Sequence, residues 1–238
     1  MTDPLVLVPG MMCDARLFLP QIIALSSETA VQIAPVIEGE NVEAMARDIL
    51  MRAPDTFALA GLSMGGIIAM EVLRLAPKRI TRLALMDTNC QSELPNIAAA
   101  RESQIVGARS GRLADVMREE MKPTYLAPGS QRADVLKTVM DMALYLGPDV
   151  FVRQSRILQR RPDQQSTLRK AKTPTLIMCG EYDTLTPPRR HEFMAHLMPN
   201  AVLELIHDAG HLITLEQPEA VTNLLRRWLK APSSVPLA

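Results

Sequence analysis

The sequence has few aromatic residues and no excess of either charge. Aromatic residues make up 3% of the 238 residues, and 26 Lys and Arg balance 26 Asp and Glu. A neutral chain lacks the basic footprint that phosphate binding needs, so we expect no nucleic-acid partner. No apolar run approaches the roughly 20 residues of a membrane helix, and the start of the chain lacks the pattern of a signal peptide. We therefore expect a cytoplasmic protein without a membrane span.

Cysteine is also scarce. Cys13, Cys90 and Cys179 are widely spaced and odd in number, which fits neither a disulfide framework nor a zinc cluster. We expect no metal and no cofactor, and we interpret Cys13 as a small buried hydrophobic residue rather than a second nucleophile. The 15 methionines predict an aliphatic, adaptable core and pocket.

Short apolar runs alternate with helical patterns along most of the chain. This alternation predicts an α/β fold, with a mostly parallel sheet of about six strands covered by helices on both faces. The length suits one domain, with or without an insertion. The strands are expected at residues 4–8, 30–34, 56–60, 82–86, 175–179 and 201–206.

One stretch, residues 91–172, interrupts this rhythm because it contains no convincing strand. We interpret it as an inserted helical lid. Residues 1–90 and 173–230 then form the core, and 231–238 a flexible tail. Helices of the lid are expected near residues 96–108, 112–121, 131–146 and 149–161.

The lid region carries a positive charge excess. Residues 101–172 contain 14 Lys and Arg against 8 Asp and Glu. Such a surface is able to steer acidic substrates toward a cleft. Arg153, Arg156 and Arg160 form a helical stripe opposite the apolar positions, and we interpret that stripe as a solvent-facing surface.

Residues 61–65 read Gly-Leu-Ser-Met-Gly, between an apolar strand and a helix. This pattern is typical of a nucleophile elbow, a sharp turn that holds a serine in a strained conformation and needs small flanking residues. Ser63 is therefore the candidate nucleophile. A hydroxyl needs a base that a third group orients.

Four histidines are available as the base. His191 and His196 lie on a predicted helix and are interpreted as surface residues. His211 follows the last strand next to Gly210 and is the candidate base, with His207 as the alternative. We expect the orienting acid at the end of the preceding strand.

Asp183 is the candidate for that acid, because it lies just beyond the strand at 175–179. Glu181 and Asp87 are the alternatives, and Asp183 also fits a helix N-cap. Acyl transfer needs N–H donors for an oxyanion. We expect them to be the backbone N–H groups of Met64, directly after the serine, and Met11, in the loop after the first strand.

In this order, four motifs resemble the α/β-hydrolase superfamily: the Pro-Gly-Met turn at 9–11, residues 61–65, Gly-Glu-Tyr-Asp at 180–183, and Gly-His at 210–211. The resemblance covers nearly the whole chain. It implies the α/β-hydrolase fold with a lid, and it places Ser63, Asp183 and His211 on the triad positions. By position in that fold, Met11, Met12, Cys13 and Leu212 line an apolar acyl pocket.

Two departures from the superfamily are visible. Lidded members usually carry His-Gly where this chain has Pro9-Gly10, so the oxyanion loop needs a different brace. The stretch 34–40 also lacks the glycine-rich pattern that many members carry after the next strand. We therefore expect a divergent branch whose substrate does not follow from the resemblance.

We expect a serine hydrolase that cleaves a small carboxylic ester through an acyl-enzyme, with a small-molecule acyl substrate as its partner. The same triad serves C–C bond hydrolysis of ring-cleavage products, thioester hydrolysis, lactone opening, perhydrolysis and acyl transfer, because the fold does not fix the bond. A ligand-binding protein on the same scaffold is the alternative of another class. A homodimer through the lid is also possible.

Overall fold

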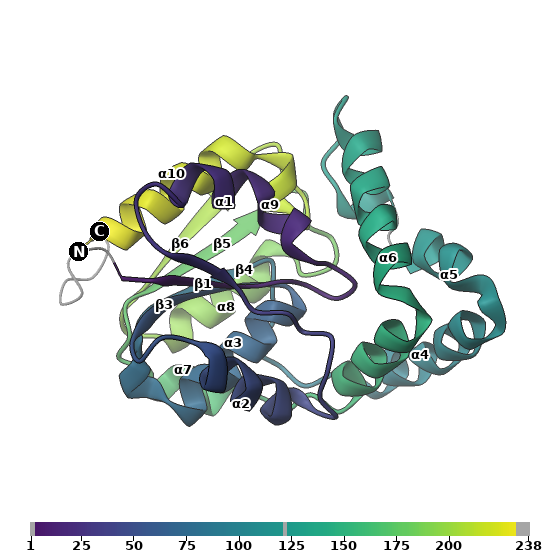
Figure 1. Cartoon of the computed structure of the whole chain (residues 1–238), viewed down its shortest axis with the longest axis horizontal. Helices are drawn as coiled ribbons and strands as arrows, with labels where there is room; N and C mark the ends of the chain where they lie inside the picture. Colours follow the sequence, from purple (N-terminus) through teal and green to yellow (C-terminus); the bar gives the residue numbers. More distant parts are fainter. Residues whose placement is uncertain (1–2, 121–122, 232–238) are drawn as a thin grey trace.

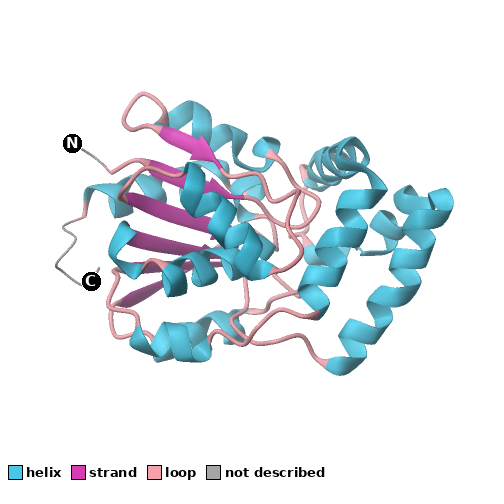
Figure 2. Ribbon diagram, turned by 60° about the horizontal axis from the view of Figure 1, so that its bottom comes forward, coloured by secondary structure: helices cyan, strands magenta, loops and turns pink. Residues whose placement is uncertain are grey.

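The computed structural model describes residues 3–120 and 123–231, so most of the expected tail, 232–238, lies outside the described residues. Six parallel strands form one sheet in the order β2-β1-β3-β4-β5-β6 (Figures 1 and 2). The predicted parallel sheet is confirmed, with each strand at its expected place. The strands are β1 (Leu5–Val8), β2 (Val31–Ile33), β3 (Phe57–Leu62), β4 (Ile80–Met86), β5 (Thr175–Gly180) and β6 (Ala201–Ile206).

Helices cover both faces of the sheet, as Figure 1 shows. Successive residues of a strand point to opposite faces. Leu5 and Leu7 of β1 accordingly join one apolar cluster, and Val6 and Val8 join the other. One face is covered by α1 (Leu19–Leu25), α9 (Ile213–Glu216) and α10 (Pro218–Lys230), and the other by α2 (Val42–Arg52), α3 (Met64–Leu75), α7 (Gln165–Lys170) and α8 (Pro188–Leu197).

Local sequence signals set several of these helix ends. The side chain of Asn41 accepts a hydrogen bond from the N–H of Ala44 and caps the N-terminus of α2. Pro188 and Pro218 begin α8 and α10 at positions where a missing N–H costs nothing. The helix α7 was not among the predicted elements, and it packs against α3 and α8.

Beyond the carboxyl ends of the strands lies a group of helices that we call the helical layer: α4 (Pro95–Gly107), α5 (Leu113–Glu120) and α6 (Arg132–Gln159) (Figures 1 and 2). The predicted helices at 131–146 and 149–161 are the two halves of α6. They meet at Gly147, whose φ of 80° interrupts the helix before Pro148. The division of the chain into core and lid domains stays a prediction.

The stripe of arginines along α6 and at its C-terminal end is less exposed than expected. Arg153 donates a hydrogen bond to the carbonyl of Ile37 at 2.6 Å, and Arg156 pairs with Glu102 of α4. Of the three, Arg160 is the exposed one. The stripe therefore partly ties the helical layer to the core.

Within the described residues, no helix combines the length and apolar character needed to cross a membrane.

Candidate active site

Ser63 lies between β3 and α3, with φ of 55° and ψ of −118°. These values are rare for a residue with a side chain, so the surrounding structure must hold the turn. A β-carbon at Gly61 would collide with the carbonyl of Gly65, and one at Gly65 would collide with the carbonyl of Val8. The steric reason for small residues at both positions is therefore visible in the structure.

His211 follows β6 and is buried beside Ser63. Its Nε2 lies 3.0 Å from the Oγ of Ser63. The backbone N–H of His211 donates to the carbonyl of Tyr125 at 2.7 Å, and Tyr125 belongs to the short helix η4 (Pro123–Tyr125) between α5 and α6. A segment outside the sheet thus helps to fix the histidine.

Asp183 lies in the loop after β5, and its Oδ2 is 2.9 Å from the Nδ1 of His211. Its Oδ1 accepts hydrogen bonds from the N–H groups of Leu185 and Thr186, and its Oδ2 also accepts one from the hydroxyl of Thr186. Burial opposes the charged form, but His211 and the Thr186 hydrogen bonds outweigh it and lower the pKa of Asp183 to about 2. Asp183 is therefore a carboxylate at neutral pH.

The alternative base and one alternative acid lie away from Ser63. His207 is 84% exposed, and its Nδ1 lies 3.3 Å from the carboxylate of Glu181. His207 and Glu181 therefore contact each other at the protein surface. Asp87 is buried, and its Oδ1 accepts a hydrogen bond from Gly180 at 2.9 Å. The partner of His211 is accordingly Asp183 rather than Asp87.

One of the two histidines interpreted as surface residues is buried. His196 is exposed as expected, but the interpretation of His191 is wrong, because His191 is completely buried and its Nε2 accepts a hydrogen bond from the N–H of Thr88 at 2.9 Å. Burial lowers the pKa of His191 to about 4. His191 is therefore a neutral core residue at neutral pH.

The two expected oxyanion donors flank Ser63 from different elements. Met64 is the first residue of α3, so its N–H has no acceptor within the helix. Met11 follows Gly10 in the loop after β1. The next N–H, that of Met12, already donates to the Oε1 of Gln154 at 2.8 Å. Gln154 belongs to α6 and supplies the brace that Pro9 cannot provide, a role that the sequence does not signal.

A cavity of about 550 Å³ opens beside Ser63. The predicted pocket residues Met12, Cys13 and Leu212 all line it, as do Met11 and Met64. Such a volume suits a small molecule. Burial raises the pKa of the Cys13 thiol to about 12, which fits its interpretation as a hydrophobic residue.

Two buried carboxyl groups, those of Asp87 and Glu216, connect the loops of the site, and neither was assigned this role from the sequence. Asp87 binds Gly180 of β5 and lies 3.4 Å from the N–H of Ile213, next to the His211 loop. Burial, followed by the nearby Asp183 and Glu216, raises the pKa of Asp87 well above its usual range.

Glu216 is the second of these carboxyl groups. Its Oε2 accepts hydrogen bonds from Ala127 at 2.7 Å and Gly210 at 2.9 Å, and its Oε1 accepts one from Leu212 at 2.9 Å. The carboxylate therefore joins the loop that carries His211 to the segment before α6.

Among the described residues, Asp87, Cys179 and His191 bring three possible metal-ligand atoms within 4.8 Å of one another. Each is already engaged. His191 accepts from Thr88, the Cys179 thiol donates to the carbonyl of Gly180, and Asp87 accepts from the N–H of Gly180. Burial raises the pKa values of Cys179 and Asp87, which disfavours the anionic forms that bind metals. The cluster fits a packed polar core better than a metal centre.

Known proteins share both sequence and fold with this chain. It is 25% identical to the dihydrolipoyllysine-residue acetyltransferase component of the acetoin cleaving system of Pseudomonas putida, over 95% of this chain. The match spans only 63% of that relative. It is 26% identical to the pimeloyl-[acyl-carrier protein] methyl ester esterase of Aromatoleum aromaticum, over 76% of this chain and 77% of the relative.

Solved structures of other proteins match the fold of this chain. A thermophilic esterase from Thermogutta terrifontis matches with a TM-score of 0.86 and 29% identity, over 96% of this chain and 89% of that one. The enol-lactonase from Burkholderia xenovorans LB400 has the same fold, with a TM-score of 0.84 and 20% identity over 97% and 93% of the two chains. The sequence pattern of the Alpha/beta hydrolase family matches residues 5–224. The chain is therefore an enzyme of the alpha/beta hydrolase family.

Proposed function

We propose that the protein is a serine hydrolase that cleaves a small carboxylic ester through an acyl-enzyme, with Ser63 as nucleophile, His211 as base and Asp183 as orienting acid. The observation that carries the proposal is the pair of contacts from the Oγ of Ser63 to His211, 3.0 Å, and from His211 to Asp183, 2.9 Å. A hydroxyl held this way can lose its proton as it attacks.

In the first step, Nε2 of His211 takes the proton of Ser63 while the Oγ attacks the carbonyl carbon of the ester. The charge that develops on the carbonyl oxygen is stabilised by the N–H groups of Met11 and Met64. The bond to the alkoxy group then breaks. His211 gives its proton to the leaving alkoxide, and an alcohol departs from the acyl-enzyme.

Water completes the cycle. It attacks the acyl carbon as His211 takes one of its protons, and the bond between the acyl group and Ser63 breaks. His211 returns the proton to the Oγ, and the carboxylic acid leaves. The Asp183 carboxylate holds the Nδ1–H tautomer of His211 and stabilises the imidazolium that forms in both steps.

Hydrolysis of 4-nitrophenyl butyrate tests this proposal. Ser63→Ala should lower kcat by about 10⁴-fold or more, because the attacking group is lost. Ser103→Ala is the control, since the Ser103 hydroxyl is bound to the carbonyl of Ala100 on the exposed side of α4. Equal rates for wild type and Ser63→Ala would exclude Ser63 as the nucleophile.

A further inference from the structure

The cavity beside Ser63 has a charged region as well as its apolar lining. Three arginines line it, and they come from three elements that are distant in sequence: Arg101 of α4, Arg161 just after α6, and Arg190 of α8. The carboxylates among the lining residues are those of Glu93 and Asp163. Guanidinium groups therefore outnumber carboxylates on the wall of the cavity.

Glu93 is occupied by one of the arginines. Its side chain is 4% exposed, and its Oε2 lies 2.6 Å from the Nε of Arg101, with a second contact of 3.3 Å from Arg101 Nη2 to Oε1. The same Arg101 lies 3.8 Å, through Nη1, from the Sδ of Met11. The charged region therefore reaches the loop that carries the expected oxyanion donor.

Arg161 and Arg190 have weaker partners. Arg161 is 13% exposed, and its Nη1 is 3.6 Å from Glu93, beyond hydrogen-bond length, while its Nε donates to the carbonyl of Gln91. No carboxylate of the described chain lies within ion-pair distance of Arg190. Asp163 does little to neutralise the charge of these arginines, because it is exposed and both its carboxylate oxygens accept hydrogen bonds from Gln165.

These cations also lie close enough to oppose one another. Burial lowers the pKa of Arg161, and the neighbouring Arg101 and Arg190 lower it further, against the opposite effect of Glu93. An added anion stabilises these two half-buried guanidinium groups more than it would stabilise arginines that already have carboxylate partners. The reason is that Arg and carboxylate groups form strong, charge-assisted hydrogen bonds.

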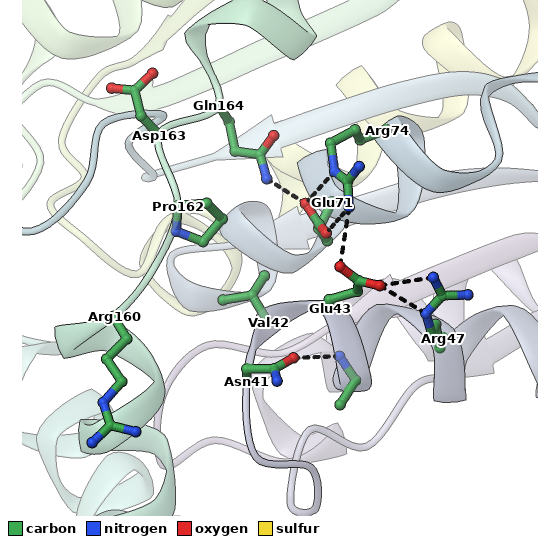
Figure 3. A pocket seen from close by; sticks show the side chains of 11 residues that line it. Asn41, Val42, Glu43, Arg47, Glu71, Arg74, Arg160, Pro162, Asp163 and Gln164 are labelled. Carbon is green, nitrogen blue, oxygen red and sulfur yellow. Dashed lines mark hydrogen bonds and ion pairs between the residues drawn. The ribbon is translucent and has the colours of Figure 1, made fainter.

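A second pocket of the molecule shows the contrasting case (Figure 3). There Arg47 binds Glu43, Arg74 binds both Glu43 and Glu71, and Gln164 donates to Glu71. Each of these two cations has a carboxylate within 3.3 Å. Arg160, the third arginine of that pocket, is exposed to solvent, so the half-buried pair beside Ser63 is the better candidate for binding an anion.

We propose that Arg161 and Arg190 bind a free carboxylate on the acyl part of the substrate, so that the enzyme prefers monoesters of small dicarboxylic acids. This inference rests on the proposed function, since it names the substrate class of the same site. The ester carbonyl lies at Ser63, and the distal carboxylate of the same molecule extends to the two arginines.

The test compares substrates that differ in one charge: monomethyl and dimethyl esters of succinic, glutaric and adipic acid. For the best monomethyl ester, Arg161→Gln and Arg190→Gln should each lower kcat/KM by about tenfold to a hundredfold, since one charged hydrogen-bond partner is lost. The values for the dimethyl esters should change less than about twofold, and Arg161→Lys should retain part of the preference. Arg112→Gln, an exposed arginine outside the cavity, should change neither.

Equal losses for mono- and dimethyl esters, or a wild type that prefers the dimethyl esters, would overturn the inference and leave the proposed function intact. A binding measurement tests the carboxylate site separately from the proposed hydrolase function. Calorimetry with monomethyl glutarate on Ser63→Ala and on Ser63→Ala/Arg161→Gln needs no turnover. Weaker binding by about tenfold or more in the double variant supports the carboxylate site even if no ester is hydrolysed, and equal binding contradicts it.

Discussion

The side-chain oxygen of Gln154 accepts a hydrogen bond from the backbone N–H of Met12 at 2.8 Å, although 142 positions separate the two residues. The amide nitrogen of Gln154 donates in turn to the carbonyl of Val36 at 2.8 Å. Both contacts are buried, and Met12 has a φ of 55°. A single glutamine of α6 therefore holds the loop that carries the backbone of Met11 in an unfavourable conformation.

Replacing Gln154 with leucine should weaken catalysis and stability together. Leucine leaves the buried N–H of Met12 unpaired, which costs about 1–3 kcal/mol of unfolding free energy. If the loop shifts, one oxyanion donor is misplaced, and kcat should fall about tenfold to a thousandfold with little change in KM. Gln154→Glu keeps an acceptor for Met12 and should lose less of kcat than Gln154→Leu. Urea unfolding and ester kinetics measure both effects, and an unchanged kcat in Gln154→Leu would contradict this role.

Glu216 should matter for stability more than its place on a short helix suggests. Glu216→Gln replaces one of the two acceptor oxygens by an NH₂ group, so at least one of the N–H groups of Ala127, Gly210 and Leu212 loses its partner. We expect a loss of about 1–3 kcal/mol in urea unfolding. Glu219→Gln, an exposed substitution in the first turn of α10, should change stability by less than about 0.5 kcal/mol. Similar values for both variants would show that the Glu216 network contributes nothing.

The lowered pKa of Asp183 predicts a loss of stability in acid. The folded chain holds this carboxylate deprotonated down to about pH 2, whereas an unfolded aspartate takes up its proton near 3.9. Its stabilisation is therefore complete above about pH 4 and disappears as the pH falls toward 2. The unfolding free energy of Asp183→Asn should decrease less than that of wild type over this interval. Parallel curves for the two proteins would contradict the lowered pKa.

Asp87 should have the opposite effect on the pH dependence of stability. Its pKa is raised in the folded chain, so the folded state retains a proton that the unfolded chain releases near pH 3.9. Stability therefore declines as the pH rises from about 4 toward the raised pKa. Asp87→Asn, which is never charged, should gain on wild type over that range. A constant difference between the two proteins from pH 4 to 8 would contradict this prediction.

The arrangement of the candidate site could largely be predicted because its determinants are local. The glycines at 61 and 65 predict the turn that carries Ser63. The ends of β5 and β6 place Asp183 and His211 on neighbouring loops. The central strands β1, β3, β4 and β5 are buried on both faces and read as nearly continuous apolar runs, so this part of the sheet was predictable for the same reason.

The residues that brace the site could not be predicted in this way. Gln154 and Glu216 act through partners 142 and 89 positions away, and nothing local distinguishes them from other polar residues of a helix. His191 did leave a signal. It shares the helical spacing of the buried Met194 and Met198, which indicates an inward-facing position.

Labelling with a fluorophosphonate tests the central claim most directly, because only an activated serine reacts. Intact mass and peptide mapping of the wild type should show one adduct, at Ser63, after brief exposure to a small excess of reagent. The adduct should be absent in Ser63→Ala and form far more slowly in His211→Ala, which lacks the base. A folded wild type that stays unlabelled, or an adduct that persists in Ser63→Ala, would contradict the assignment of Ser63 as the nucleophile.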